Sequence, residues 1–413
     1  MAGLAGRAGH RLFAPVVAGA AAAATARSRR RGWPEQHQGG LPSAWCLPAL
    51  RCDALTGTSS MRRRGEFARE LFPPEPTLSE FLSFETYIFD CDGVIWGIPE
   101  EDTKRSVATI NHLLRLDKRV MFITNNSNKS RQRFVQELEK RGLDFGTRTG
   151  EEKLHMMISA SFTTANFLRS VGVRRPFVIT SETGLLDELR LAGIKEYFAA
   201  VNDDGSTPPE FLSALMKGGP PETGFPEVAD IVEAHPCVDC IVVGWDLGLT
   251  ARKVATAINY IKWHEDLHSN QLGYRPMMIV AASSDTSGVL GKADFNGHEV
   301  KLRAIGNGPM AEIIAHSFDP PREWLDCGKP SDTLLWMLRG VYKVDLQHAL
   351  MVGDTLQTDI IFGNRGGMQT LLVFSGVTTE RDLDGAVKAG NPMRKPTYVL
   401  PKLGAFHERG ELA

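Results

Sequence analysis

The chain has 413 residues, more than the ~250–300 at which a single hydrophobic core stops growing, so we expect two domains and an extension. Its hydrophobic share of 42%, charged share of 23% and formal net charge of −2 are typical of a globular protein. A net charge so close to zero gives no electrostatic reason to expect a nucleic acid as partner.

The first 65 residues differ from the rest in composition. They hold ten Arg, no Lys and two acidic residues, which gives them a charge of +8. An Arg-bearing start, an Ala-rich apolar run and the small-residue site ATA precede an Arg-rich stretch, a composition typical of a targeting segment. We therefore predict that residues 1–65 are a disordered targeting segment; the alternative is a tail without an address. The apolar run at 12–26 is shorter than the ~20 residues that span a bilayer, and no later run is long enough, so we expect no membrane helix.

The six cysteines are few and scattered for this length, which favours a reducing compartment over a disulfide scaffold. Cys237 and Cys240 have the spacing of a metal or redox pair. They lead directly into the apolar run CIVVG, and no second pair accompanies them. We interpret them as ordinary strand cysteines rather than as a zinc site or a thiol switch.

From about residue 85 short apolar runs alternate with helical patterns, which predicts an α/β fold with a parallel sheet covered on both faces. The runs are YIF, VMFI, FVI, IVV, MMIV, ALMV and TLLVF. Ser130 and Ser331 are predicted helix caps, and Thr250 is predicted to start another helix.

Several segments carry polar residues where a strand would end, the place where ligands bind to open parallel sheets. These segments are FDCDG, FITNNSNKS, LDCGKPS and MVGDTLQTD. We expect adjacent strands to bring all four to one edge of the sheet.

The first of these segments sets two carboxylates on one side of an extended chain, because residues i and i+2 point the same way. Asp90 and Asp92 repel each other unless a cation or a shared proton intervenes. Asp354 and Asp359 add negative charge at the same edge, and Mg²⁺ is the hard cation that suits such oxygen ligands. A metal held by anionic ligands in turn attracts an anion, and we expect a phosphate.

Three further residues could hold that phosphate. Lys329 supplies a compact positive charge, and Thr124 and Asn125 can give hydrogen bonds where a helix begins. These are the parts needed for phosphoryl transfer. An Asp can also act as nucleophile, so Asp90 would attack phosphorus while Asp92 serves as general acid and base.

The motifs DCDGV, TNNS, GKP and GDTLQTD resemble, in order and type, the four motifs of the haloacid dehalogenase (HAD) superfamily of phosphatases. The stretches TNNSNKSR, VVGWD and TDIIFGNRGGMQTLLVFSGVT are similar to the eukaryotic phosphoglycolate phosphatase, 4-nitrophenylphosphatase and pyridoxal phosphatase branch. The match runs from about residue 85 to 400. It implies a Rossmann-like core at 85–165 and 325–405, with a large α/β cap at 166–324 inserted between the second and third motifs.

The resemblance also implies roles for single residues. The nucleophile would be Asp90 and the acid/base Asp92. Mg²⁺ would be held by Asp90, the backbone carbonyl of Asp92 and Asp354, with Asp359 in support. The phosphate would be held by Thr124, Asn125 and Lys329. Relatives commonly dimerise through their caps, so a homodimer is expected.

The sequence departs from these relatives at three places. The fourth motif reads GDT, with Thr355 where GDR is usual, and a cap strand that often ends ATN ends AAS before Ser284 and Asp285. After VVGWD, the residues LGL, including Gly248, lack the His and aromatic of many relatives. We expect these changes to bear on substrate choice and not on the core chemistry.

Other readings of single motifs are weaker. DCDG could open a calcium loop, but VIWGIP provides none of the further oxygen ligands. GNGPMA, residues 306–311, matches a dinucleotide-binding pattern with Asp326 about twenty residues on, yet no clear apolar strand ends at Gly306. We interpret these glycines as the turn through which the cap returns to the core. Trp96 and Met310 are predicted to be packing residues.

The sequence thus predicts a Mg²⁺-dependent phosphomonoesterase acting on a small phosphorylated metabolite through an aspartyl phosphate. The favoured substrate is 2-phosphoglycolate, from the resemblance and from a leader that suits a plastid. Alternatives are a broad 4-nitrophenyl phosphate or pyridoxal 5′-phosphate phosphatase and, from another class, a noncatalytic nucleotide-binding or regulatory protein. The composition of the leader also fits a mitochondrial targeting segment, so a mitochondrion is the alternative location. If residues 1–65 are not a targeting signal, we expect a cytoplasmic protein.

Overall fold

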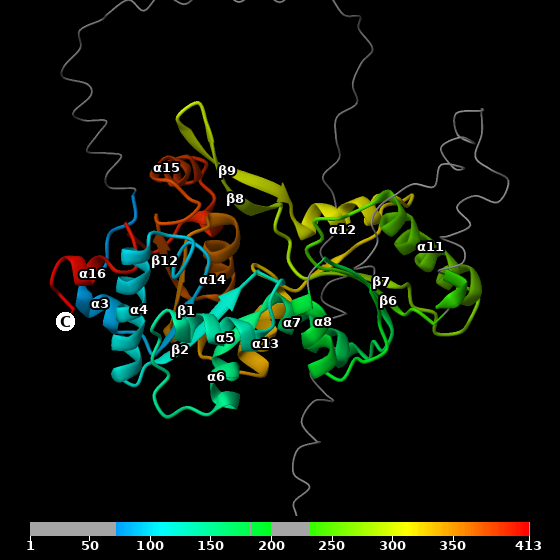
Figure 1. Cartoon of the computed structure of the whole chain (residues 1–413), viewed down its shortest axis with the longest axis horizontal. Helices are drawn as coiled ribbons and strands as arrows, with labels where there is room; N and C mark the ends of the chain where they lie inside the picture. The colour runs from blue at the N-terminus through cyan, green and yellow to red at the C-terminus, as the bar shows by residue number, and fades with distance from the viewer. Residues whose placement is uncertain (1–71, 182, 200–231, 236, 413) are drawn as a thin grey trace, which may run out of the picture. The chain divides into compact units, whose positions relative to one another are not determined.

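The computed structural model describes residues 72–181, 183–199, 232–235 and 237–412. The predicted targeting segment, residues 1–65, lies outside the described residues. Within them, the strands form a six-stranded sheet, a five-stranded sheet and a two-stranded hairpin, with helices between (Figure 1). The predicted α/β class, with parallel sheets, is confirmed.

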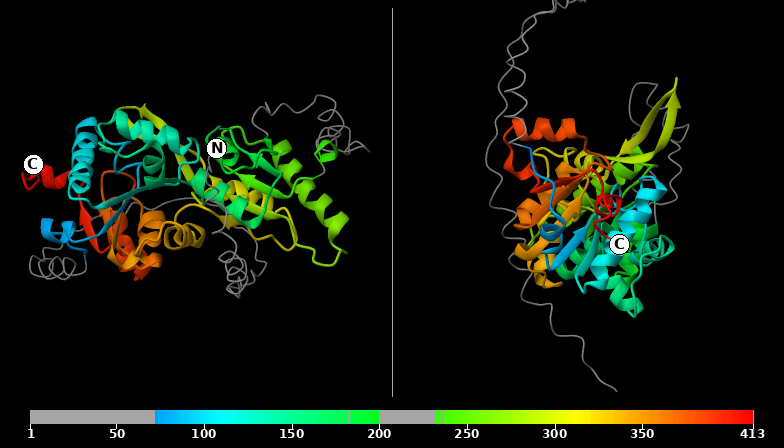
Figure 2. Two further views of the ribbon diagram at one scale, coloured as in Figure 1. Left: turned by 90° about the horizontal axis from the view of Figure 1, so that it is seen from below. Right: turned by 90° about the vertical axis from the view of Figure 1, so that its left-hand side faces the viewer.

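The six-stranded sheet is parallel at every pairing. Its order is β13 (Tyr398–Leu400), β12 (Gln369–Val373), β11 (Ala349–Gly353), β1 (Thr86–Phe89), β2 (Arg119–Thr124) and β3 (Met157–Ser159). Tyr87 and Phe89 of β1 join one hydrophobic cluster, with α4 (Glu100–Arg115) and α5 (Arg131–Lys140). Ile88 points the other way and joins a second cluster, with α13 (Asp332–Gly340) and α14 (Ile361–Gly366). Helices therefore cover both faces, as Figure 2 also shows.

The five-stranded sheet is parallel as well. Its order is β10 (Leu325–Asp326), β7 (Met278–Ala281), β6 (Cys240–Val243), β4 (Pro176–Ile179) and β5 (Phe198–Ala199). Helices α11 (Ala251–His268) and α12 (Asn307–Ala315) pack on one face, and α7 (Ala160–Val171) and α8 (Thr183–Leu191) on the other. Cys240 begins β6 and is buried, whereas Cys237 is exposed.

The strands thus belong to two sheets, and this corrects the expectation that all four polar segments follow one sheet. Three of them follow β1, β2 and β11 of the six-stranded sheet. The fourth, with Lys329, follows β10, which pairs with β7 of the five-stranded sheet. The chain therefore returns to the six-stranded sheet after Asp326. This order of elements is a Rossmann-like core interrupted by an α/β cap, as predicted; the domain limits 85–165, 325–405 and 166–324 stay a prediction.

A hairpin of β8 (Ser287–Phe295) and β9 (His298–Ile305) extends away from the five-stranded sheet (Figure 1; Figure 2). The end of this hairpin shows that our interpretation of GNGPMA, residues 306–311, as the turn that returns to the core was wrong. Strand β9 ends at Ile305, directly before Gly306, and Gly306 caps α12 rather than forming the return to the core. Because β9 is antiparallel to β8, this is not the parallel strand–turn–helix unit of a dinucleotide site.

One of the two predicted caps, Ser331, is confirmed, and a helix starts after Thr250 as predicted. The side chain of Thr250 accepts a hydrogen bond from Lys253 N, and that of Ser331 accepts one from Leu334 N. Ser130 precedes α5 but makes no such bond. The remaining described helices are α3 (Leu78–Leu82), α6 (Gly150–Met156), α15 (Glu380–Lys388) and α16 (Ala405–Glu408), with short turns at Leu346–His348, Leu356–Ile360 and Pro392–Arg394. No helix in the described part of the chain combines the length and apolar character that crossing a bilayer requires.

Candidate functional site

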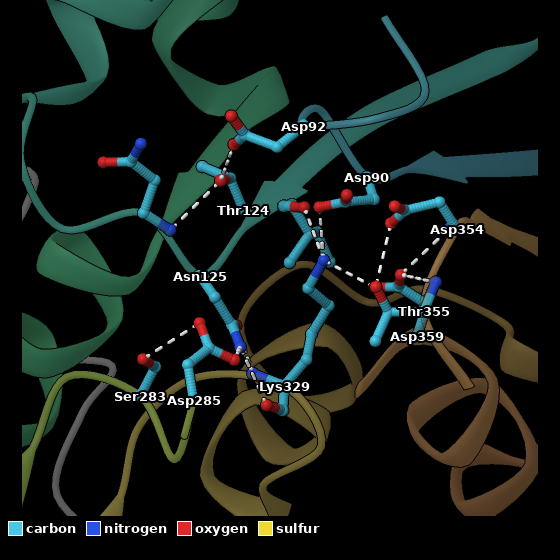
Figure 3. A network of polar contacts seen from close by, with 12 residues as sticks. Asp90, Asp92, Thr124, Asn125, Ser283, Asp285, Lys329, Asp354, Thr355 and Asp359 are labelled. Atoms are coloured by element: carbon cyan, nitrogen blue, oxygen red, sulfur yellow. Dashed lines mark hydrogen bonds and ion pairs between the residues drawn. The ribbon is translucent and has the colours of Figure 1, made fainter. Parts of the chain in front are cut away.

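The predicted site residues meet at the carboxyl ends of three neighbouring strands (Figure 3). Asp90 follows β1, Thr124 ends β2 and Asp354 follows β11. Asp359 lies on the π-helical turn Leu356–Ile360, and Lys329 enters from the loop after β10. The structure thus brings together residues that are more than 260 positions apart in the sequence.

Lys329 lies at the centre of this group and is 2% exposed. Its Nζ forms ion pairs with Asp90 Oδ1 and, at 2.7 Å, with Asp359 Oδ1, and it donates to the carbonyl of Ile123 at 3.2 Å. Burial alone would lower the pKa of this ammonium, but the carboxylates of Asp359 and Asp90 outweigh burial and raise the pKa above its usual value. Lys329 is therefore a permanent positive charge in the site.

The carboxylates of the site carry more negative charge than Lys329 neutralises. Burial raises the pKa of Asp90 well above its usual range, against the pull of Lys329, and the Asp359 and Asp354 carboxylates raise it further. Burial likewise raises the pKa of Asp354 to about 7, and Asp359 adds to the rise. An excess of buried carboxylate over ammonium is the electrostatic condition that a bound cation relieves.

The donor set fits a hard divalent cation. Among the described residues, carboxylate oxygens of Asp90, Asp354 and Asp359 lie within 4.8 Å of one another, and all three residues are buried. Oxygen donors at this spacing, with an unbalanced negative charge, suit Mg²⁺ or Ca²⁺ rather than a soft metal.

Asp359 is engaged mainly with the protein itself. Its Oδ2 accepts the backbone N–H groups of Asp354 and Thr355 at 3.1 and 3.0 Å, while its Oδ1 pairs with Lys329. The Thr355 hydroxyl donates to Asp354 Oδ1 at 3.0 Å. These contacts favour Asp359 as a residue that holds Lys329 and the Asp354 loop in place.

Two glycines allow the backbone to approach Asp354 closely. A Cβ on Gly376 would lie 1.8 Å from Asp354 Oδ2, and one on Gly93, whose φ is +83°, would lie 2.4 Å from the same atom. The neighbouring Val377 N–H donates to this oxygen at 2.6 Å. The carboxylate of Asp354 is thus fixed by close backbone packing on two sides.

Asp92 differs from the other carboxylates because its side chain is accessible to solvent. Trp96 Nε1 donates to its Oδ1 at 3.0 Å, and the Thr124 hydroxyl lies 3.4 Å from its Oδ2. Protein atoms around it still raise its pKa through desolvation, although the hydrogen bond from Trp96 and the positive charge of Lys329 oppose the rise. Asp92 is therefore the carboxylate of the group that can exchange protons with a ligand and with water.

Asn125 uses its side chain differently from what the sequence predicts. Its Oδ1 accepts the Lys329 backbone N–H at 2.7 Å, and its Nδ2 donates to the Lys329 carbonyl at 3.0 Å and to Asp285 Oδ1 at 2.9 Å. The amide is thus turned toward the main chain of Lys329. That Asn125 holds phosphate through its side chain stays a prediction, and its present contacts are those of a residue that positions Lys329.

Sequence reasoning missed two contributors to the site, Asp285 and Trp96. Asp285 follows β7 by four residues, accepts hydrogen bonds from Asn125 and from Ser283 Oγ (3.3 Å), and its pKa is raised by burial. The rule that led to Asp90 and Asp354, an acid just beyond a buried strand, would have found it. Trp96 was expected only to pack, and it also donates to Asp92.

The cap supplies a second buried ion pair close to the end of β6. Lys253 of α11 is 2% exposed, and its Nζ donates to Asp246 Oδ2 at 2.8 Å and to the Gly248 carbonyl at 2.9 Å. Asp246 Oδ1 also accepts the Gly248 N–H at 2.9 Å. The ion pair therefore fixes the loop at Asp246–Gly248, which the sequence analysis predicts to bear on substrate choice.

Comparison with known proteins places these motifs in one family. A haloacid dehalogenase-like hydrolase model matches residues 87–195, and a HAD-hydrolase-like model matches residues 326–406. In the sequence, strands β5, β6 and β7 of the five-stranded sheet lie between the two matched segments.

Individual relatives agree with the family models. The chain is 32% identical over 336 residues to phosphoglycolate phosphatase 1A, chloroplastic, of Arabidopsis thaliana, covering 78% of this chain and 76% of the relative. It is 27% identical to glycerol-3-phosphate phosphatase of Gallus gallus, covering 85% and 97%. Among solved structures, a p-nitrophenyl phosphatase from Archaeoglobus fulgidus shares the fold with a TM-score of 0.53 at 22% identity, covering 79% of this chain and 99% of that one.

Proposed function

The chain belongs to the haloacid dehalogenase-like hydrolases and is a phosphoric monoester hydrolase, and from this premise we propose that it hydrolyses 2-phosphoglycolate through an aspartyl phosphate on Asp90. The observation that carries the proposal is the buried group of Asp90, Asp354, Asp359 and Lys329 beside the accessible Asp92. It combines a nucleophile, a cation-binding set and an acid in one place.

The first chemical step transfers the phosphoryl group to Asp90. A carboxylate oxygen of Asp90 attacks phosphorus, and the bond from phosphorus to the ester oxygen breaks. Asp92, in its protonated form, gives its proton to the leaving oxygen so that a neutral alcohol departs. Lys329, paired with Asp90, holds the nucleophile in place and offsets the negative charge that the phosphate brings.

The second step regenerates the enzyme. Asp92, now a carboxylate, takes a proton from water as the water oxygen attacks phosphorus. The bond from phosphorus to the Asp90 oxygen breaks, and inorganic phosphate leaves. Thr124, next to Asp92, and Lys329 would contact the phosphate oxygens in both steps, with Asn125 keeping Lys329 in position.

Mg²⁺ is the cofactor that we assign to the buried carboxylates. It would be held by Asp90, the backbone carbonyl of Asp92 and Asp354, with Asp359 in support. When bound, it supplies positive charge at the phosphate oxygens that lowers the barrier to phosphoryl transfer. The excess of carboxylates over ammonium supports this assignment.

The choice of 2-phosphoglycolate rests on the similarity to the chloroplastic phosphatase and on the leader. The loop at Asp246–Gly248, fixed by Lys253, is the part of the cap expected to distinguish substrates. The rival substrates are glycerol 3-phosphate, pyridoxal 5′-phosphate and 4-nitrophenyl phosphate. The same proposal includes a plastid location, which imaging of a fluorescent fusion to residues 1–71 would test. It also includes a homodimer formed through the caps, which light scattering would test.

The direct test measures phosphate release by the full chain from these four esters, with and without Mg²⁺, and with Asp90→Asn as control. We expect release that depends on Mg²⁺, prefers 2-phosphoglycolate and disappears in the control, because an amide cannot form an acyl phosphate. Comparable slow release from all four would replace the proposal by a generalist phosphatase. Release by Asp90→Asn equal to wild type would contradict the mechanism, and no release by wild type would favour the noncatalytic alternative.

A further inference from the structure

The turn after β1 brings Trp96 back beside Asp92. Gly93 and Gly97 have φ values of +83° and +74°, in the left-handed region that a tight turn uses. Gly93 N donates to the Trp96 carbonyl at 2.6 Å, and Trp96 N donates to the Cys91 carbonyl at 3.1 Å. The backbone therefore fixes the indole next to the carboxylate four residues earlier.

The indole contacts one oxygen of Asp92 and leaves the other available. Trp96 Nε1–H can only donate, so its 3.0 Å bond to Oδ1 places a lone pair of that oxygen toward the indole. The contact of Oδ2 with the Thr124 hydroxyl is longer, at 3.4 Å. Oδ2 is thus the oxygen better able to carry and transfer a proton.

The indole is itself held by its surroundings. Its ring stacks on Phe134 of α5 with 6.2 Å between ring centroids and 6° between ring planes. The guanidinium of Arg141 lies 5.2 Å from the centroid of the ring, and Arg141 also pairs with Glu137. A donor held by these two contacts restricts the rotamers of an exposed Asp, which would otherwise be free to turn.

We propose that Trp96 is a positioning residue for proton transfer: its indole N–H binds Asp92 Oδ1 and so directs Oδ2 toward the leaving oxygen of the substrate. The inference rests on the proposed role of Asp92 as general acid. It gives Trp96 a function beyond packing, and it names the oxygen through which the proton moves.

Leaving groups of different basicity separate this role from a structural one. An alkoxide is too basic to leave without a proton, whereas 4-nitrophenolate leaves readily as an anion. Trp96→Phe keeps an aromatic ring against Phe134 and removes the N–H. We expect kcat/KM for 2-phosphoglycolate or glycerol 3-phosphate to fall by about tenfold or more, and that for 4-nitrophenyl phosphate by less than about threefold.

The readout is the ratio of the two kcat/KM values within one preparation, which does not depend on the fraction of active enzyme. Asp92→Asn should change the ratio in the same direction and further. Trp336→Phe, a replacement on α13 at a residue 38% exposed, should leave it unchanged. If Trp96→Phe does not fold, replacing the indole by a benzothiophene, which has the same shape without the N–H, makes the same test.

The outcomes are distinct. A ratio shifted against the alkyl esters supports the positioning role. An equal loss for both ester types, or no loss for either, overturns it while the proposed function stands. If wild type releases phosphate from none of the esters, the proposed function itself fails.

Discussion

Replacing Lys329 by Met should destabilise the protein more at pH 8 than at pH 5. The substitution keeps most of the side-chain volume and removes the ammonium that pairs with Asp90 and Asp359. At 2.7 Å, the distance to Asp359, and an effective dielectric constant of about 20, one pair is attracted by roughly 6 kcal/mol. The cost of burying the ammonium offsets part of this, and removing one partner of a buried pair costs about 3–5 kcal/mol net.

The pH dependence follows from the carboxylates that remain. Lys329 holds the pKa of Asp90 down against burial, so its removal raises that pKa further. A carboxyl with a raised pKa keeps a proton that the unfolded chain, with an Asp pKa of about 3.9, has already released. The free energy of unfolding therefore falls by up to about 1.4 kcal/mol per pH unit and group as pH rises from about 4 toward the folded-state pKa.

The assay is urea denaturation of the metal-free protein in EDTA at pH 5 and pH 8. The difference in free energy of unfolding between wild type and Lys329→Met should be small at pH 5 and reach several kcal/mol at pH 8. Lys388→Met, which removes an exposed ammonium paired with Asp384, should cost less than about 1 kcal/mol at both pH values. A loss for Lys329→Met that is the same at both pH values would refute the reasoning.

Three further predictions concern the surroundings of the site. Asp285→Ala removes one of the two acceptors of the Asn125 Nδ2 group and should reduce kcat/KM for phosphate release by about tenfold. Asp285→Asn, which retains an acceptor, should lose less, and equal losses would contradict a hydrogen-bonding role. Gly376→Ala should displace Asp354 and reduce kcat by about a hundredfold. Gly385→Ala, where a Cβ meets open space, should leave kcat unchanged. Circular dichroism checks that both variants fold. Mg²⁺ at a hundred times its dissociation constant should stabilise the metal-free wild type by about 2.7 kcal/mol in calorimetry, and Asp354→Asn much less; equal stabilisation would place the cation elsewhere.

The sequence predicts the reacting residues because each stands at the end of an element with a readable pattern. Asp90, Thr124 and Asp354 end apolar runs that form β1, β2 and β11. The carboxyl ends of neighbouring parallel strands lie at one edge of the sheet, so residues that follow these strands lie close together although they are far apart in the sequence. The order of the motifs then indicates the cap between them.

The contacts that Trp96 and Asn125 make with the reacting groups could not be predicted in this way. Trp96 reaches Asp92 only because a turn with two positive-φ glycines folds back, and Asn125 turns to Lys329 only because β10 belongs to another sheet. The hairpin β8–β9 differs from these cases, because β9 alternates apolar and charged residues from Val300 to Arg303, a strand signal that the sequence does contain. Lys253 is buried because its ammonium pairs with Asp246, which lies in the preceding loop. The helical pattern of the sequence does not predict such a pair.

The central claim is that phosphate passes through Asp90, and trapping the intermediate tests it most directly. Wild-type enzyme mixed with substrate is quenched in acid during turnover and reduced with borohydride, which converts an acyl phosphate to the alcohol of homoserine. Mass spectrometry of the peptide that contains residues 86–96 should find homoserine at position 90 only when substrate is present. Unmodified Asp90, or homoserine at another aspartate, in a sample that releases phosphate would contradict the mechanism.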